Sequence, residues 1–240
     1  IFSIQYGGTF WINYYCEADR LGITTIHLTE VKKIMKVILV NGSPHEKGCT
    51  YTALTEVEKI LNKEGIETEI MWLGNDPVAG CSVCGACFKS GRCFGNDVVN
   101  TFIEKMSQAD GFVFGSPVHY ASASGALTSF MDRAFYGRGG LVAGKPAAAV
   151  VSCRRGGATA AFDQINKYFS ISNMPIVTSQ YWNQVHGNTP EQVVQDEEGM
   201  QTMRTLGMNM AWLLKCIEAG KKAGIDRPGD EKKIATIFRR

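Results

Sequence analysis

The sequence lacks long hydrophobic runs and a strong excess of either charge. None of its apolar stretches reaches the roughly 18 residues that a membrane-spanning helix needs. Its formal net charge is only +2 over 240 residues. No basic run is interleaved with aromatic residues, so nothing indicates a nucleic-acid or membrane partner. We therefore expect a cytoplasmic globular protein, in which a reducing environment keeps cysteines free for metal or redox chemistry.

Several functional motifs are also missing. GxGxxG, the dinucleotide fingerprint, does not occur, and neither does the GxxxxGK[ST] phosphate loop. Neither a nucleophile elbow nor a metalloprotease helix is present, which argues against hydrolysis. There is no internal repeat and no low-complexity linker. The chemistry therefore has to be sought in the loops of one ordinary domain.

The first 34 residues differ from the rest of the chain, because a buried-strand pattern, MKVILVNGSP, begins abruptly at Met35. Thr29-Glu30-Val31 can be encoded by a purine-rich stretch that resembles a bacterial ribosome-binding site. We therefore expect translation to begin at Met35, which would make residues 1–34 a leader and 35–240 the domain. The alternative is an N-terminal arm that packs its aromatic side chains, Phe10, Trp11, Tyr14 and Tyr15, on the domain or on a partner subunit.

From Met35 onward, short β-branched runs alternate with segments of helical periodicity, which is typical of a parallel sheet covered by helices. The expected strands span residues 37–41, 68–73, 111–115, 147–152 and 176–178. Apolar stripes predict helices at 53–61, 98–106, 127–134, 162–169 and 203–217, the last being a C-terminal extension. The fold class is therefore α/β, a doubly wound parallel sheet with helices on both faces.

The loops after the strands are the candidate binding site, since ligands of doubly wound sheets bind beyond the carboxyl ends of the strands. Residues 41–50 lead from the first strand directly into a helix, whose free N–H groups suit a phosphate. Without a dinucleotide fingerprint, this loop indicates a mononucleotide. The alternative is a simple turn in which Thr50 caps the helix. Residues 115–125 and 152–157 could receive a flat ring.

Two segments, VILVNGSPHEKGCT and ADGFVFGSPVHYASASGALTSFMDR, together with Gly156-Gly157, resemble the NADPH-dependent FMN reductase family of flavodoxin-like proteins. The resemblance covers nearly all of the chain from Met35. It implies five strands in the order 2-1-3-4-5 and an FMN held by three loops. Ser43, His45, Gly48, Cys49 and Thr50 would surround the phosphate; Pro117, Val118, His119 and Tyr120 would line the isoalloxazine; and Ser152, Gly156 and Gly157 would lie near its polar edge. The chain has His45 where the family often has Arg, and Cys49 where Asn or Ser is common.

Four of the eight cysteines lie in CSVCGACFKSGRC, residues 81–93. Iron–sulfur flavoproteins, a branch of the same family, hold a 4Fe–4S cluster with a similar motif, which implies Cys81, Cys84, Cys87 and Cys93 as ligands. A redox-active or merely reduced thiol loop is the main alternative, and zinc is a third, although zinc sites usually join two separated CxxC pairs. Because the loop comes after the second strand, we expect it beside the flavin loops.

The resemblance implies an FMN-dependent oxidoreductase of the flavin or quinone reductase type. NAD(P)H would reduce the flavin, and a quinone, free flavin, aromatic compound or cluster would accept the electrons; ferredoxin is an alternative reductant. His119 and Tyr120 are the catalytic candidates, with His186 a second proton donor. The alternatives are an electron carrier without a small-molecule substrate and a thiol or iron redox sensor. Relatives complete the flavin cleft with a neighbouring subunit, so we expect a homodimer or homotetramer that uses Gln180–Gly187, QYWNQVHG, unless this loop closes its own domain.

Overall fold

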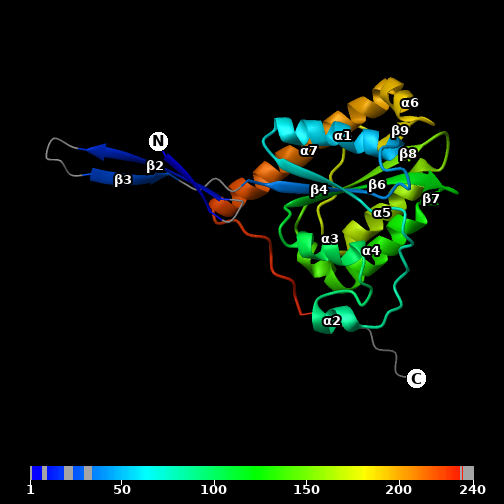
Figure 1. Cartoon of the computed structure of the whole chain (residues 1–240), viewed down its shortest axis with the longest axis horizontal. Coiled ribbons are helices and arrows are strands. Elements are labelled where there is room, and N and C mark those ends of the chain that lie inside the picture. The colour runs from blue at the N-terminus through cyan, green and yellow to red at the C-terminus, as the bar shows by residue number, and fades with distance from the viewer. Residues whose placement is uncertain (1, 7–9, 19–23, 30–33, 233, 235–240) are drawn as a thin grey trace.

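The computed structural model describes residues 2–6, 10–18, 24–29, 34–232 and 234. Its centre is a parallel sheet of five strands (Figure 1). In spatial order these are β5 (Glu67–Trp72), β4 (Lys36–Asn41), β6 (Gly111–His119), β8 (Ala147–Cys153) and β9 (Gln184–His186). The short strand β7 (Ser122–Ala123) pairs with β6 in the antiparallel sense. Counted from Met35, this is the predicted order 2-1-3-4-5, and the flavodoxin-like fold class is confirmed.

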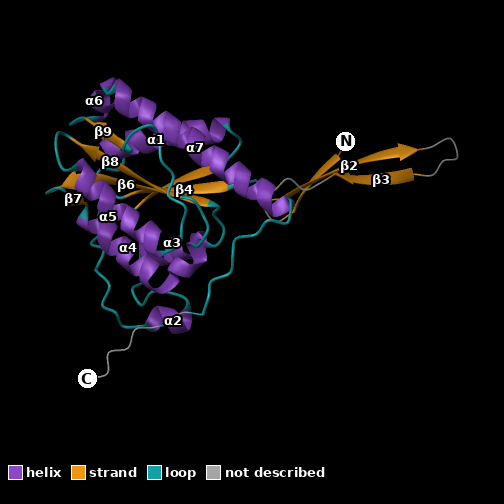
Figure 2. Cartoon of the chain, turned by 180° about the vertical axis from the view of Figure 1, so that it is seen from behind, coloured by secondary structure: helices purple, strands orange, loops and turns teal. Residues whose placement is uncertain are grey.

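Helices cover both faces of the sheet (Figure 2). One face carries α1 (Cys49–Lys63), α6 (Pro190–Gln195) and α7 (Glu197–Lys222), and the other carries α3 (Val98–Met106), α4 (Gly125–Arg138) and α5 (Ala158–Ile171). Each face of the sheet has its own hydrophobic core. In β4, Val37 and Leu39 point into the core under α1 and α7, whereas Ile38 and Val40 point into the core under α3, α4 and α5; all four are fully buried. Burial on both faces explains why the central strands are continuous apolar runs.

Two short elements lie outside these layers, the helix α2 (Ala86–Ser90) and the 3₁₀ turn η1 (Gly139–Val142). The C-terminal helix α7 is longer than the predicted 203–217. It begins after Asp196, whose carboxylate accepts a hydrogen bond from the Gly199 N–H at 3.0 Å. No helix in the described part of the chain is long and apolar enough to cross a membrane.

The predicted fifth strand at 176–178 is wrong in position. Ile176 makes only an isolated bridge with Ala147, at the start of β8. The chain then leaves the sheet and returns as β9, which pairs with the last three residues of β8. Two short contacts, one at each end of β8, therefore replace a continuous fifth strand. The apolar residues Ile176 and Val177 indicate only the contact at the start of β8.

The N-terminal segment forms a separate antiparallel sheet of β1 (Phe2–Tyr6), β2 (Phe10–Ala18) and β3 (Thr24–Thr29). Its side chains, among them Phe10, Trp11, Tyr14 and Tyr15, lie outside what the structure describes. Both expectations for residues 1–34, a leader upstream of the true start and an arm that packs its aromatic residues, therefore stay predictions.

Candidate functional site

Three loops meet at the carboxyl edge of the sheet, and hydrogen bonds join the first two of them. The Gly42 N–H donates to the Gly115 carbonyl at 2.9 Å. The Ser124 hydroxyl donates to the Gly42 carbonyl at 2.7 Å, and the Ser124 N–H donates to the Ser116 hydroxyl at 2.8 Å. The loop after β4 and the loop after β6 are therefore one bonded unit.

The loop after β4 is held in shape by its own side chains. The Asn41 amide donates to the Glu46 carbonyl at 2.9 Å and accepts from the Ser43 N–H at 3.1 Å. The Ser43 hydroxyl accepts from the His45 N–H at 3.1 Å. On the outside, the Trp72 indole N–H donates to the Ser43 carbonyl at 2.8 Å, a contact that sequence reasoning missed. These bonds preorganise the loop ahead of any ligand.

Helix α1 begins behind this loop with an uncapped N-terminus. Its N-cap is Gly48, which supplies no side-chain hydrogen bond, so the alternative in which Thr50 caps the helix is wrong. The N–H groups of the first turn and the helix dipole favour an anion at this end. His45, Gly48 and Cys49 border an open hollow of about 570 Å³ here, together with residues 188–190. Backbone geometry, more than side-chain charge, therefore makes this end of the helix a candidate site for an anion.

Thr50 lies inside the first turn of α1, and its hydroxyl bonds to the Ser152 hydroxyl at 2.8 Å, where both residues are buried. We expect Thr50→Val to leave the Ser152 hydroxyl unpaired and to lower the free energy of unfolding by roughly 1–3 kcal/mol. Urea denaturation of the FMN-free chain measures this change. Thr52→Val is the matched control, because the Thr52 hydroxyl only bonds back to the Gly48 carbonyl of its own helix. Equal stability of the two variants would contradict the expectation.

The loop after β6 is a tight hairpin in which His119 pairs with Ser122. Its two turn residues, Tyr120 and Ala121, have φ values of 51° and 58°, which are unfavourable for residues other than glycine and asparagine. Tyr120 is fully exposed, so a half-buried packing role for it is excluded. His119 is also exposed, and Pro117 and Val118 are half-buried. A strained turn that presents an unpacked aromatic ring is typical of a binding site.

The loop after β8 packs directly on this hairpin. Gly157 has a φ of +90°, and a Cβ atom built on it would lie 2.7 Å from the Cα atom of Ala121. Gly156 is exposed, and Ser152 is buried at the end of the strand. The twelve residues predicted to bind the cofactor therefore belong to three loops at one edge of the sheet.

Next to this loop, the Cys153 sulfur lies 3.4 Å from Nδ1 of His186. Burial raises the pKa of the Cys153 thiol, so it is protonated at neutral pH. The His186 backbone N–H donates to the Asp196 carboxylate at 2.6 Å, which fixes the start of the 186–189 turn. His186 is thus placed at the same edge as the three loops.

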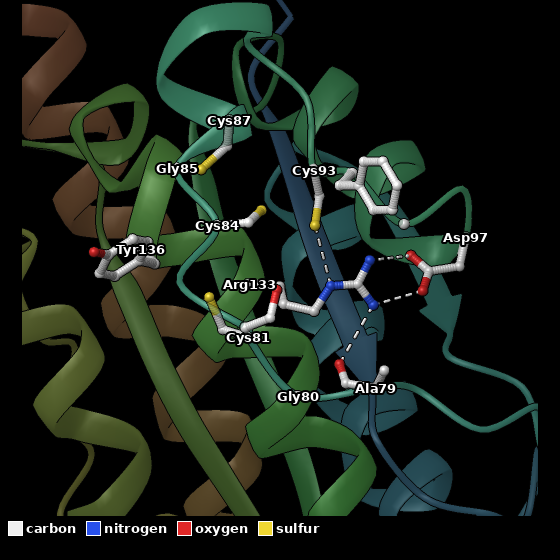
Figure 3. Close-up of a pocket in the computed structure, with 13 residues that line it drawn as sticks. Ala79, Gly80, Cys81, Cys84, Gly85, Cys87, Cys93, Asp97, Arg133 and Tyr136 are labelled. Atoms are coloured by element: carbon white, nitrogen blue, oxygen red, sulfur yellow. Dashed lines mark hydrogen bonds and ion pairs between the residues drawn. The ribbon is translucent and has the colours of Figure 1, made fainter.

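The four clustered cysteines line one cavity of about 240 Å³ (Figure 3). Cys81, Cys84 and Cys87 succeed one another along one side, and Cys93 stands opposite them beside Arg133. Cys87 is buried, Cys81 and Cys93 are half-buried, Cys84 is exposed, and all four are free thiols. The backbone N–H of Ala86 and the Ser82 hydroxyl hold the pKa of the Cys84 thiol below its ordinary value.

This cavity does not lie beside the flavin loops, so the expected position is wrong. Residues 79–97 form most of its lining, and Arg133 and Tyr136 from the C-terminal half of α4 complete it. Beside the cavity, a Cβ atom on Gly137 would lie 2.2 Å from the Cys87 sulfur, and the Phe88 and Tyr136 rings are 5.5 Å apart. At a rise of about 1.5 Å per residue, Gly137 is roughly 18 Å along α4 from Gly125, next to the hairpin. The chain from 73 to 85 has no regular structure and carries the cysteines away from the edge where β5 ends.

The residue types in the cavity fit an iron–sulfur cluster, since four thiols are its usual donors and Arg133 supplies a buried positive charge beside them. Within the described residues, however, no three His, Cys, Asp or Glu side chains are close enough to hold a metal ion as they stand. Binding would require the four sulfurs to come closer together than they lie here.

Comparison with known proteins agrees with this architecture. Residues 35–189 match the model of the family described as NADPH-dependent FMN reductase. An iron–sulfur flavoprotein of Methanocaldococcus jannaschii is 34% identical, with 77% of this chain and 100% of the relative aligned. A second, from Methanosarcina thermophila, is 26% identical over 78% of this chain and 99% of the relative.

Solved structures show the same fold at low identity. A flavodoxin from the domain Archaea superposes with a TM-score of 0.52 at 15% identity, covering 75% of this chain and 99% of that one. A flavone reductase gives 0.59 at 18% identity, covering 77% and 64%. The sheet order, the three adjoining loops and the matched relatives agree: the chain belongs to the NADPH-dependent FMN reductase family, in its iron–sulfur flavoprotein branch.

Proposed function

We propose that the chain is an FMN-dependent oxidoreductase that accepts electrons from NADH or NADPH. The proposal rests on one observation: the three loops and the uncapped N-terminus of α1 lie together at the carboxyl edge of the sheet. Helix α1 is 15 residues long, which is enough for its dipole to favour a phosphate. FMN would supply the redox chemistry, and the chain would bind and orient it.

Each loop has a distinct part in this binding. Backbone N–H groups of Cys49 and Thr50 would hold the phosphate, with the Ser43 hydroxyl as a further donor. Gly48 would lie beside it, since its own N–H donates to the His45 carbonyl at 3.2 Å. Residues 117–120 would line the ring, and the exposed Tyr120 and His119 are placed to contact the ring or its reductant. Residues 152–157 would bond its polar edge. Because these groups share one edge, the nicotinamide would enter the same cleft.

We further propose that Cys81, Cys84, Cys87 and Cys93 hold a 4Fe–4S cluster. Two relatives that align over almost their whole length are named iron–sulfur flavoproteins, which supports this assignment. The electron acceptor would be a quinone, a free flavin, an aromatic compound or the cluster, and a protein such as ferredoxin is the alternative reductant. We expect a cytoplasmic homodimer or homotetramer in which Tyr181 and Trp182, both half exposed and 5.0 Å apart, contact a second subunit.

The test is to purify the full chain without oxygen and to measure FMN, iron, acid-labile sulfide and zinc per chain. We expect one FMN and about four irons and four sulfides, together with oxidation of NADH or NADPH when an acceptor is present. If the chain contained FMN but no metal, the cluster proposal would be wrong and the chain would be a plain flavin reductase. Bound FMN without nicotinamide oxidation would make the chain an electron carrier. A chain that binds no FMN would overturn the proposal.

A thiol redox sensor is the second candidate, and the open arrangement of the four free thiols favours it. Cys84 is exposed and its thiol pKa is lowered, which are the two properties that favour oxidation. In that case, hydrogen peroxide would convert thiols of residues 81–93 to disulfides in FMN-free protein. Mass spectrometry of the peptide spanning these residues distinguishes this behaviour from cluster binding.

A further inference from the structure

Arg133 is a buried cation in the wall of the cysteine cavity. It is 5% exposed and lies on α4 among apolar neighbours, between Phe130 and Ala134. Its guanidinium makes a bidentate ion pair with Asp97, at 2.6 and 3.0 Å. Its Nε–H points the other way and donates to the Cys93 sulfur at 3.2 Å (Figure 3). One side chain therefore connects the core helix α4, the start of α3 and one thiol.

Cys93 is also fixed through its backbone. The Asn100 amide accepts a hydrogen bond from the Cys93 N–H at 2.8 Å and donates to the Cys93 carbonyl at 3.0 Å. The same amide donates to the Gly95 carbonyl at 2.6 Å. A Cβ atom on Gly95 would lie 2.4 Å from an Arg133 nitrogen, so the backbone presses closely on the guanidinium. Cys93 is thereby held at its N–H, its carbonyl and its sulfur.

The other end of the cysteine segment is arranged differently. Cys84 is exposed, and its neighbour Val83 is 63% exposed with a φ of +54°, a strained conformation for a β-branched residue. Among the described cysteines of this segment, Cys93 has hydrogen bonds at its N–H, its carbonyl and its sulfur. The cavity thus combines Cys93, which is hydrogen-bonded at its backbone and its sulfur, and the packed Cys87 with an exposed, strained turn at 83–84.

We infer that Arg133 is a positioning residue that fixes the Cys93 thiol as the preset anchor of the cysteine cavity, onto which the 81–86 turn closes. What Arg133 does to the cluster-bound chain rests on the 4Fe–4S cluster proposed above. There, the hydrogen bond from the Arg133 Nε–H to a ligand sulfur stabilises the more negative, reduced state, while Asp97 offsets the charge of the guanidinium. Arg133 therefore raises the reduction potential of the cluster, while its effect on Cys93 exists without metal.

The experiment compares wild type with Arg133→Met and Arg133→Lys. Arg92→Met is the control, because it removes the same charge next to Cys93, whereas Arg92 is exposed and paired with Glu104. Hydrogen exchange of metal-free full chain is measured at the peptide spanning residues 91–97. The second readout is the reduction potential after anaerobic reconstitution with iron and sulfide. Arg133→Lys keeps the charge without the fork geometry and serves if the methionine variant does not fold.

We expect exchange at 91–97 to be at least about tenfold faster in Arg133→Met, with Arg92→Met like wild type. We also expect a lower potential: a tenfold loss in relative stabilisation of the reduced state corresponds to about 59 mV for a one-electron couple. For both the exchange rate and the reduction potential, Arg133→Lys should lie between wild type and Arg133→Met.

Unchanged exchange in both Arg133 variants, or potentials that match Arg92→Met, would overturn the inference. Failure of the wild type to take up iron would instead count against the proposed cluster, and the exchange result would still decide whether Arg133 fixes Cys93.

Discussion

Gly157→Ala is expected to weaken FMN binding by roughly 10- to 100-fold, which corresponds to a strain of about 1–3 kcal/mol. Gly157 has a φ of +90°, and an added Cβ would lie 2.7 Å from the Cα atom of Ala121 and 3.1 Å from a methyl carbon of Val118. The nearest obstacle is backbone, so it cannot rotate away. Either the 153–157 loop or the hairpin at Tyr120 has to shift, and both are walls of the proposed flavin site. Fluorescence titration of FMN-free protein measures the affinity.

Gly140→Ala is the control for this prediction. Gly140 is exposed in η1, outside the three loops of the proposed flavin site, and nothing lies within 4 Å of a Cβ built on it. We expect its FMN affinity to stay within about threefold of wild type, as for other unconstrained surface substitutions. Equal affinities for the two variants would show that the contact between the third loop and the hairpin does not shape the flavin site.

The parts of the fold that could be predicted from sequence are those in which local pattern and burial coincide. β4 and β8 are buried on both faces, so their apolar runs indicated strands directly. The fifth strand was misplaced because its pairing is split. Residues 184–186 carry a single fully buried hydrophobic side chain, Val185, and such a short segment has no periodicity to detect.

The three loops of the proposed flavin site could be placed from sequence because parallel strands all end at one edge of the sheet. The polar contacts that shape the sites could not. The Trp72–Ser43 bond spans 29 residues, and the Arg133–Asp97 pair spans 36. A signal for Arg133 did exist: it is a charged residue on the apolar stripe of a helix, between Phe130 and Ala134. Such a residue needs a buried partner.

The position of the cysteine segment shows a different limit. Sequence order placed it after β5, at the edge where the flavin loops lie. Residues 73–80, which have no regular structure, separate β5 from Cys81, and an extended chain covers about 3.3 Å per residue. Such a linker can reach either end of α4, so only the tertiary contacts of Cys87 and Cys93 decide its place.

Cys87→Ser is expected to lower the iron content after anaerobic reconstitution from about four per chain to near zero, because one of the four thiolates of the proposed cluster is lost. Cys87 is the buried member of the four, and its sulfur lies against the backbone of α4 at Gly137. Another thiol could take its place as a ligand only if α4 moved. Serine is slightly smaller and fits the same space, so the fold is expected to persist. Iron and sulfide analysis gives the result.

FMN content measured on the same samples separates loss of the cluster from loss of the fold. The α4 residues that line the cysteine cavity, Arg133 and Tyr136, lie roughly 12–16 Å along the helix from Gly125, next to the hairpin, by the rise of an α-helix. Cys87→Ser should therefore retain FMN like wild type. Cys216→Ser, an exposed thiol on α7, is the control and should retain both groups. Full iron in Cys87→Ser would contradict the ligand set. Joint loss of iron and FMN would mean that Cys87 acts through packing, because a disturbed α4 would reach both the cavity and the hairpin at Tyr120.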